Sequence, residues 1–176
     1  RFQDSVDDIE GVVRYAKSRG AKEVYLAGHS TGCQKSVYYA TRKGNARKIK
    51  GVILLAPISD YPRAIHPNQR EGRKQVRMAQ KLMRAGERSA IVPGTWADAQ
   101  RFLSLNTPES IEEIFAYVTP KKIPKTYRSL TVPTLVLFAE KDEYSDRPAT
   151  KMADWFKSNA GAKKYHARII RAVEHS

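Results

Sequence analysis

A serine lies between two glycines directly after a short apolar run. Residues 22–34 read KEVYLAGHSTGCQ, and the pattern Gly-x-Ser-x-Gly is made by Gly28, His29, Ser30, Thr31 and Gly32. The composition before this pattern is typical of a strand, and the spacing after it is typical of a helix that stops at Gly44. A serine on a sharp strand-to-helix turn protrudes from the backbone, as a nucleophile must. We therefore predict a nucleophilic Ser30, the alternative being a turn serine without a chemical role.

The backbone around Ser30 leads to two further predictions. Gly28 and Gly32 are expected to be small so that strand and helix can approach each other. The helix that begins at Thr31 would direct its free N–H groups and the positive end of its dipole toward the serine. We therefore expect the Thr31 N–H to be one donor of an oxyanion hole.

A nucleophilic serine needs a base, and the base needs an acid to orient it. Asp142 lies just past the apolar run TLVLFA, and His175 lies just past ARII. The carboxyl ends of parallel strands form one edge of a sheet, where such residues meet. The chain order serine, aspartate, histidine is that of α/β-hydrolases. We predict Asp142 as the acid and His175 as the base.

Other residues compete for the acid and base roles. The rival acids are three neighbours of Asp142 and one residue after an earlier strand, namely Glu140, Glu143, Asp146 and Asp60. The rival bases are His29, His66 and His166. None of these histidines follows the end of a predicted strand on its own loop as His175 does.

Strand-like and helix-like segments alternate along the chain. Strands are expected within 23–28, 48–57, 132–142 and 163–173, and the first two read as buried on both faces. Helices are expected within 4–20, 31–44, 72–86, 97–105, 108–118 and 147–161. This alternation predicts an α/β fold with a parallel sheet and right-handed crossovers. We expect residues 1–58 and 132–176 to form the core and residues 59–131 to form a helical lid inserted into it.

The composition favours a globular protein with an unusual charge. There are 32 Lys and Arg against 18 Asp and Glu, a formal net charge of +14. Contact with nucleic acid or an acidic surface would fit this charge, although no nucleic-acid motif is present. The one cysteine, Cys33, excludes an internal disulfide, which favours a cytoplasmic location, and we expect it to be a buried packing residue rather than a reactive thiol. Histidines and cysteine show no metal-ligand spacing, so we predict neither a metal nor an organic cofactor.

Four segments together resemble an α/β-hydrolase of the serine esterase and lipase type. They are YLAGHSTGCQ, VILLAPISD, VPTLVLFAEKDEYS and the terminal EHS. GHSTGCQ together with AQRFLSLNTPESIEEIFAY further resembles a branch that includes the fungal siderophore esterases. The resemblance implies a serine hydrolase that cleaves a small-molecule ester, or less readily an amide, through an acyl-enzyme. The competing hypothesis is a hydrolase-fold subunit kept as a structural or interaction module of a basic assembly.

The sequence departs from this family pattern at both ends. In an α/β-hydrolase the strand before the serine lies centrally, so we expect earlier strands to be missing here, with the loop that supplies the second oxyanion N–H. The helix that follows the histidine is absent too. We therefore expect a piece of a longer polypeptide in which residues 23–28 become an exposed edge strand.

Overall fold

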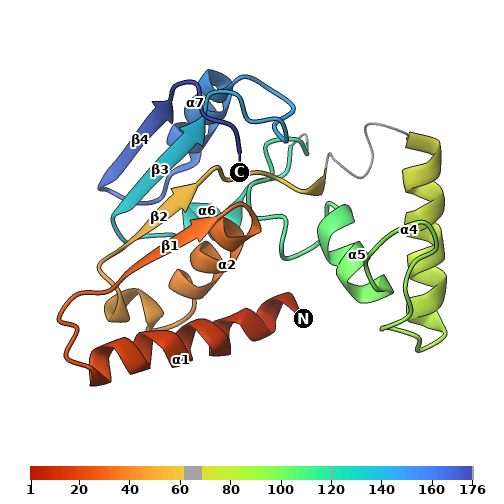
Figure 1. Cartoon of the computed structure of the whole chain (residues 1–176), viewed down its shortest axis with the longest axis horizontal. Coiled ribbons are helices and arrows are strands. Elements are labelled where there is room, and N and C mark those ends of the chain that lie inside the picture. Colours follow the sequence, from red (N-terminus) through yellow and green to blue (C-terminus); the bar gives the residue numbers. More distant parts are fainter. Residues whose placement is uncertain (62–68, 120, 176) are drawn as a thin grey trace.

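The computed structural model describes residues 1–61, 69–119 and 121–175. Its centre is a four-stranded parallel sheet whose strands lie in the order β1-β2-β3-β4 (Figure 1). The strands are β1 (Tyr25–His29), β2 (Gly51–Leu55), β3 (Thr134–Ala139) and β4 (Tyr165–Ile170). Three lie within the segments expected from the sequence, and β1 extends one residue past the expected 23–28, to His29. The predicted parallel sheet with flanking helices is therefore confirmed.

Helices connect the strands of this sheet and also form a projection at one end of the molecule (Figure 1). The α-helices are α1 (Ser5–Ser18), α2 (Thr31–Ala40), α4 (Gln69–Arg84), α5 (Ala99–Asn106), α6 (Lys125–Arg128) and α7 (Ala149–Asn159). Two short 3₁₀ helices, η1 (Phe2–Asp4) and η2 (Asn45–Lys48), precede α1 and β2. None of the helices in the described part of the chain is long and apolar enough to cross a membrane.

The main hydrophobic core lies on one face of the sheet. Val37 of α2, Tyr127 of α6 and Phe156 of α7 belong to the same buried cluster as Leu54 and Val136, which face each other across β2 and β3. Strand order follows chain order, so right-handed crossovers carry every intervening segment across the same face. This constraint sets the side on which the helices pack.

β1 is an exposed edge strand, as expected for residues 23–28 of this chain, whereas the expectation that the second strand is buried on both faces was wrong. Ile53 and Leu55 of β2 are half-exposed, and β1 lies at the sheet edge with Tyr25 and Ala27 exposed. A continuous apolar run shows that the side chains on both faces of a strand are apolar, but it does not show that other elements cover both faces. Here the crossovers place the packed helices on one side only.

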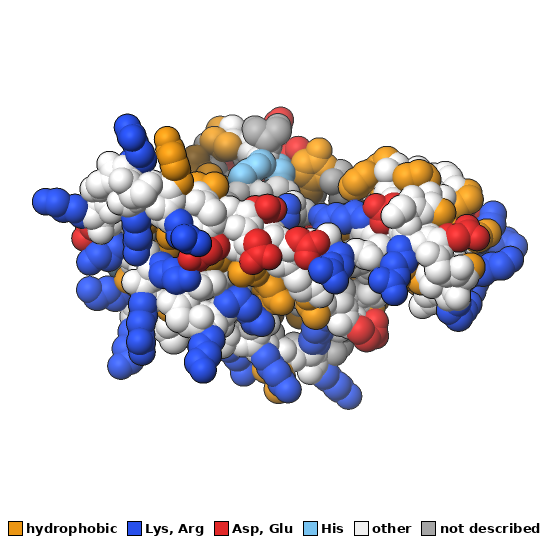
Figure 2. Space-filling model, turned by 90° about the horizontal axis from the view of Figure 1, so that it is seen from below, with side chains coloured by type: hydrophobic (Ala, Val, Ile, Leu, Met, Phe, Trp, Pro, Cys, Tyr) orange, Lys and Arg blue, Asp and Glu red, His pale blue; other side chains and the backbone are white. Residues whose placement is uncertain are grey.

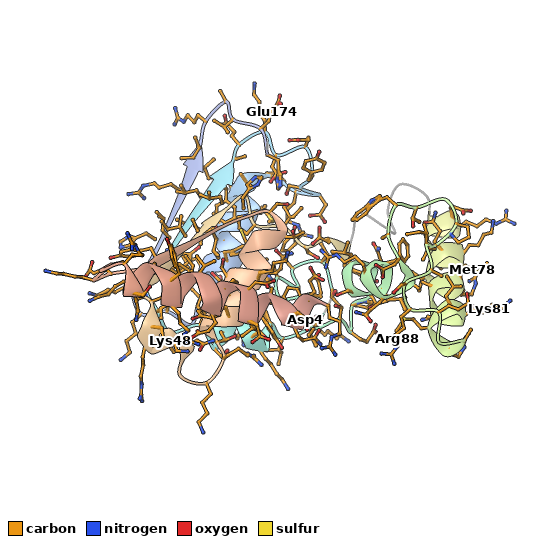
Figure 3. All side chains as sticks on the ribbon, turned by 60° about the horizontal axis from the view of Figure 1, so that its bottom comes forward. Asp4, Lys48, Met78, Lys81, Arg88 and Glu174 are labelled. Atoms are coloured by element: carbon orange, nitrogen blue, oxygen red, sulfur yellow. The ribbon has the colours of Figure 1, made fainter. Side chains whose placement is uncertain are left out.

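Residues 69–106, which we call the arm, have a core of their own. Ala79 and Val92 pack with Ala97, Ala99 and Phe102, apart from the main cluster. Figures 1 and 3 show α4 and α5 side by side at the end of the long axis, with α4 farthest from the sheet. The arm therefore stands out from the body that carries the sheet.

The segment after the arm does not form the helix expected over 108–118. It runs through turns, and six consecutive residues from Glu112 to Tyr117 are buried. A helix on a surface can bury one face, whereas these side chains are enclosed on all sides. Ile114, Phe115 and Tyr117 join the main core, so this half of the predicted lid 59–131 packs with the body rather than with the arm.

Candidate functional site

Residues that could take part in a reaction gather at the carboxyl edge of the sheet. Ser30 follows β1, Ser59 follows β2, Asp142 follows β3 and His175 follows β4. Parallel pairing brings the four strand ends to one edge, although the residues come from distant parts of the sequence. His66, one rival base, lies outside the described residues.

Ser30 occupies a strained turn between β1 and α2. Its φ is +53° and its ψ is −124°, a region that non-glycine residues seldom adopt. Its N–H donates to the Leu55 carbonyl at 3.0 Å, which ties the turn to β2. A serine at the start of a helix ordinarily caps it, but the Ser30 hydroxyl makes no capping bond to α2. This geometry leaves the hydroxyl available for chemistry.

The N–H groups at the start of α2 point toward the same turn. In the described part of the chain, the Thr31 N–H has no hydrogen-bond acceptor, as the first N–H of a helix usually lacks one inside the helix. Cys33 N–H donates to the Ser30 carbonyl at 2.9 Å. An unpaired N–H one residue after a serine suits an anionic oxygen.

The two glycines of the turn are not equivalent. A Cβ at Gly28 would lie 2.7 Å from the Cys33 nitrogen and closer still to the Gly32 carbonyl. A Cβ at Gly32 would meet nothing within 4 Å. The close approach of β1 and α2 therefore requires a glycine before Ser30, whereas the expected packing reason for Gly32 is not found.

Cys33 is a packing residue, as the sequence analysis expected. Its side chain is fully buried, and its thiol donates to the Gly28 carbonyl at 3.0 Å and to the Leu55 carbonyl at 3.3 Å. Burial raises the pKa of the Cys33 thiol well above its usual value, so it stays protonated.

Asp142 and His175 form a buried pair at this edge. Asp142 Oδ2 lies 3.0 Å from His175 Nδ1, and the two side chains are 9% and 5% exposed. A carboxylate can only accept, so Nδ1 carries the hydrogen and Nε2 is left as the basic nitrogen. Asp142 Oδ1 accepts from the Tyr144 N–H at 2.9 Å, which fixes the carboxylate. This arrangement orients the imidazole for work as a base.

The rival acids have other partners. Glu140 accepts from the Ala172 N–H at 2.9 Å, and Asp146 pairs with Arg147 at 2.8 Å. Glu143 accepts from the His175 backbone N–H at 3.0 Å and so holds the loop rather than the ring. Asp60 accepts from Gln34 at 3.1 Å. Asp142 is thus the carboxylate that the structure places on the His175 imidazole.

His29, a rival base in the sequence, and Tyr144, which no sequence pattern indicated, hold His175 in place. His29 Nε2 donates to the His175 carbonyl at 2.7 Å, and the two rings lie 4.9 Å apart. The Tyr144 ring meets the His175 ring edge-on at 4.8 Å. Because His29 directly precedes Ser30, its bond to His175 links the serine turn to the histidine loop. In the described residues no hydrogen bond joins Ser30 to His175 itself.

A polar network continues from α2 to the loop after β2. Gln34 donates to the Ile58 carbonyl at 3.0 Å as well as to Asp60, and its Oε1 is buried without a partner in the described residues. Ser59 Oγ lies 2.6 and 2.7 Å from the two oxygens of Glu113. The Ser59 N–H donates to the Tyr117 hydroxyl at 2.9 Å. These bonds hold the buried segment 112–117 beside the carboxyl edge.

Glu113 is the titratable residue of this network. Burial raises the pKa of its carboxyl to about 7, and the Ser59 hydroxyl and the Lys122 charge oppose this shift. No sequence pattern pointed to Glu113, because its partners come from other elements.

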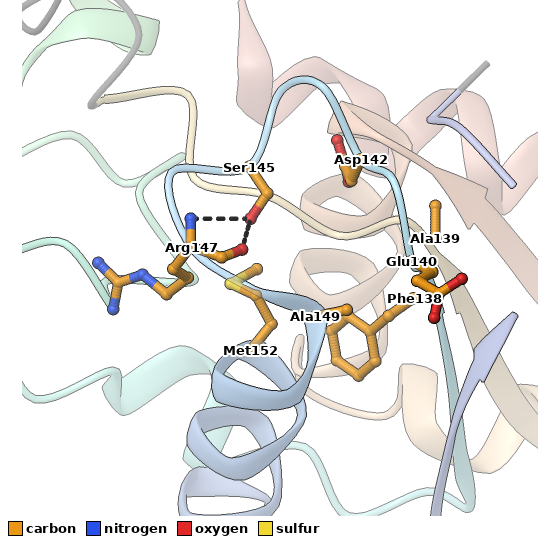
Figure 4. A pocket seen from close by; sticks show the side chains of 8 residues that line it. All are labelled: Phe138, Ala139, Glu140, Asp142, Ser145, Arg147, Ala149 and Met152. Atoms are coloured by element: carbon orange, nitrogen blue, oxygen red, sulfur yellow. Dashed lines mark hydrogen bonds between the residues drawn. The ribbon is translucent and has the colours of Figure 1, made fainter. Parts of the chain in front are cut away.

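The hollows near this edge differ in size. A crevice of about 20 Å³ lies behind the loop that carries Asp142, where Ser145 Oγ donates to the Arg147 carbonyl at 2.8 Å (Figure 4). It has room for about one water molecule and not for a substrate. A hollow of about 460 Å³ extends from Asp60 to Trp96 of the arm, with Phe102 and Leu105 in its wall. No group of three or more His, Cys, Asp or Glu in the described residues is placed to hold a metal ion.

Comparisons with known proteins agree with this fold. The family described as "Protein of unknown function (DUF1749)" matches residues 2–176. No curated protein matches the chain. Among solved structures, monoacylglycerol lipase of Paleococcus ferrophilus is similar with a TM-score of 0.59 at 14% identity, over 99% of this chain and 67% of that protein.

Two further structures show the same similarity. A soluble variant of monoglyceride lipase from Saccharomyces cerevisiae has a TM-score of 0.60 at 18% identity, over 99% of this chain and 61% of its own. Est1E from Butyrivibrio proteoclasticus has a TM-score of 0.53 at 18% identity, over 97% of this chain and 60% of its own. The chain thus spans about two thirds or less of these proteins, and the predicted α/β-hydrolase fold is confirmed. The resemblance to fungal siderophore esterases remains a prediction.

The asymmetry of the two glycines leads to a stability prediction. Gly28→Ala is expected to lower the free energy of unfolding by about 2–3 kcal/mol, because backbone atoms cannot yield to the new methyl group. Gly32→Ala is the matched control and should leave stability unchanged or raise it by up to about 1 kcal/mol, as alanine favours a helix. Urea unfolding followed by circular dichroism measures both values. Equal losses at the two positions would contradict the close approach at Gly28.

Glu113 leads to a prediction of pH dependence. A carboxyl whose pKa is raised on folding binds its proton more tightly in the native state, so stability declines as pH rises from about 4.5 to about 7. Relative to Glu113→Gln, the wild type should lose up to about 3 kcal/mol of unfolding free energy between pH 5 and 8. Unfolding curves across this range measure the difference. Glu109→Gln, at an exposed position, is the control, and its stability should vary with pH as that of the wild type does. If the stability of the wild type and of Glu113→Gln varied with pH in the same way, the raised pKa of Glu113 would be refuted.

Proposed function

The chain belongs to the DUF1749 family, and from its α/β-hydrolase fold and the geometry of the site we propose that it is a serine hydrolase that cleaves ester bonds. The observation that carries the proposal is the buried Asp142–His175 pair beside the strained turn of Ser30. The three residues follow three different strands in the order serine, aspartate, histidine. A strained serine that does not cap its helix has no evident structural purpose. A nucleophilic serine, by contrast, needs such a turn so that its hydroxyl protrudes from the backbone.

The proposed reaction proceeds through an acyl-enzyme. Ser30 Oγ attacks the ester carbonyl carbon while its proton passes to His175 Nε2, and Asp142 stabilises the resulting imidazolium. The negative oxygen of the tetrahedral intermediate is stabilised by the Thr31 N–H and the N-terminus of α2. Collapse of the intermediate expels the alcohol, which takes the proton from His175. Water activated by the same histidine then hydrolyses the acyl-serine bond and restores the enzyme.

His29 contributes to this chemistry by position. Its bond to the His175 carbonyl fixes the distance between the histidine loop and the residue before the nucleophile. The hollow between Asp60 and Trp96 is the proposed place for one side of a small-molecule ester, because its apolar wall is joined through Asp60 and Gln34 to the turn of α2 that follows Ser30.

Covalent labelling tests the nucleophile. A fluorophosphonate probe is expected to label the wild type and Ser158→Ala, since Ser158 is an exposed serine in the last turn of α7 and is not a member of the proposed triad. Ser30→Ala should lose both labelling and hydrolysis of a short acyl ester, leaving at most about 10³-fold catalysis over water. Circular dichroism checks that the variant remains folded. Undiminished labelling or turnover in Ser30→Ala would refute the assignment of this serine.

Two asparagine variants test the acid. Asp142→Asn removes the carboxylate from the His175 imidazole and should lower kcat by up to about 10⁴-fold, because asparagine favours the wrong tautomer. Asp60→Asn changes a carboxylate that binds Gln34 instead, and it should lower kcat far less. Steady-state kinetics on the same ester compare them. A larger loss at Asp60 would move the acid to the loop after β2.

A further inference from the structure

A row of basic side chains follows one exposed side of α4. It consists of Arg70, Arg73, Lys74, Arg77, Lys81 and Arg84, all exposed. Their spacings of three and four residues place them within about 100° of the helix circumference, at 3.6 residues per turn. We call this row the basic stripe. It extends for about 21 Å along the helix at 1.5 Å per residue.

The opposite side of α4 is occupied by packing. Val76, Ala79, Leu82 and Met83 face the arm core against Phe102 of α5. Because its apolar face packs against the arm core, α4 has a fixed orientation, and the stripe faces outward from the arm. Every residue of the stripe is exposed, so a partner outside the arm can reach it along its whole length.

The charge of the stripe has little compensation within the protein. Glu71 is the single acidic residue of α4, and the one ion pair of the stripe within the described residues joins it to Lys74 at 3.8 Å. Neighbouring like charges at these spacings destabilise a helix. A row of six cations that repel each other is stabilised by an anionic partner.

Exposed apolar side chains lie on the same arm. Trp96 is 79% exposed, Ile91 57% and Met78 36%. Gln75 Nε2 donates to the Gly94 carbonyl at 3.5 Å, so the loop with Ile91 and Trp96 lies along α4. Met78 projects between the stripe and this loop, since it lies four residues after Lys74. Figure 3 shows Met78 and Lys81 on the side of α4 away from the sheet, and Figure 2 shows hydrophobic and basic atoms next to each other at this end of the molecule.

This combination identifies the chemistry of the partner. We propose that the arm docks the protein on an anionic phospholipid surface, with the basic stripe on the headgroup phosphates and Trp96 in the interfacial layer. Lipid headgroups supply a plane of negative charge next to an apolar layer, which matches cations beside an exposed tryptophan. A nucleic-acid strand would be met by aromatic side chains spaced along the cations for base stacking, and the stripe itself holds none.

The basic stripe is separate from the proposed triad, although Trp96 of the docking surface also borders the hollow proposed for the ester. The stripe lies on the helix farthest from the sheet, whereas Ser30, Asp142 and His175 lie at the carboxyl edge of the strands (Figure 1). Binding can therefore be measured without reference to hydrolysis. The proposal does not depend on the proposed activity.

Vesicle binding of charge-neutralised variants tests the proposal. The whole chain is mixed with vesicles of phosphatidylcholine and phosphatidylserine in a 7:3 ratio, or with pure phosphatidylcholine, and bound protein is measured by sedimentation. The variant Arg73→Gln/Arg77→Gln/Lys81→Gln should bind the anionic vesicles about 10- to 100-fold more weakly than the wild type. The wild type should bind pure phosphatidylcholine at least tenfold more weakly than the anionic mixture.

A matched control separates the stripe from the net charge. Lys22→Gln/Lys43→Gln/Lys157→Gln removes the same charge from exposed positions outside the arm and should change binding by less than about threefold. Circular dichroism verifies that both triple variants are folded. Equal losses in the two would show that net charge alone drives binding and would overturn the proposal.

Two further measurements decide the nature of the partner. Tryptophan emission should shift to the blue on adding anionic vesicles, and Trp96→Phe should abolish this shift. A 20-nucleotide RNA at the same salt concentration should bind at least tenfold more weakly than the vesicles. Tighter binding to the RNA that is lost in the stripe variant, or an emission shift unchanged in Trp96→Phe, would refute lipid docking.

Discussion

Parallel pairing of the four strands is the constraint on which the site depends. Each strand delivers its following loop to the same edge, and the register of β1 with β2 and of β3 with β4 sets the height at which each loop leaves the sheet. Ser30 is bound to this frame directly, because its N–H continues the ladder to Leu55. The strained turn is therefore held by sheet hydrogen bonds and by the contact of Gly28 with the first turn of α2. Without that close contact, the serine would relax into an ordinary helix cap.

The histidine loop is held differently, by bonds to its backbone. The His175 N–H donates to Glu143 and its carbonyl accepts from His29, while its ring nitrogen is engaged by Asp142. Three side chains, one at the end of β1 and two from the loop after β3, thus fix the position of His175. Restraint by three hydrogen bonds suits a general base, because its ring nitrogen must keep a fixed orientation toward the nucleophile.

Charge is distributed unevenly between the body and the arm. Glu112 and Glu113 are buried, and Glu112 pairs with Arg101 of the arm while Glu113 accepts a hydrogen bond from Ser59. On α4, by contrast, six basic residues share one exposed side with a single acidic neighbour. Buried charges must be paired because burial removes their hydration, whereas exposed charges remain hydrated and can bind an external partner. The buried charged residues therefore hold the body and the arm together, whereas the exposed charges of α4 suit an external anionic partner.

The sequence by itself determined the parallel α/β architecture and the approximate strand positions, and it pointed to the residues that are proposed to form the site. Those features depend on local composition and on the order of elements, which a single chain displays directly. Only the tertiary structure decided that Asp142 rather than Asp60 faces His175, that His29 holds its carbonyl, and that Gly28 but not Gly32 is required by packing. The tertiary structure also replaced the expected helix over 108–118 with a buried turn segment, and among the described residues it packs the helices against one face of the sheet. Such features arise where residues far apart in sequence compete for the same space and the same hydrogen bonds, and no local pattern records the outcome of that competition.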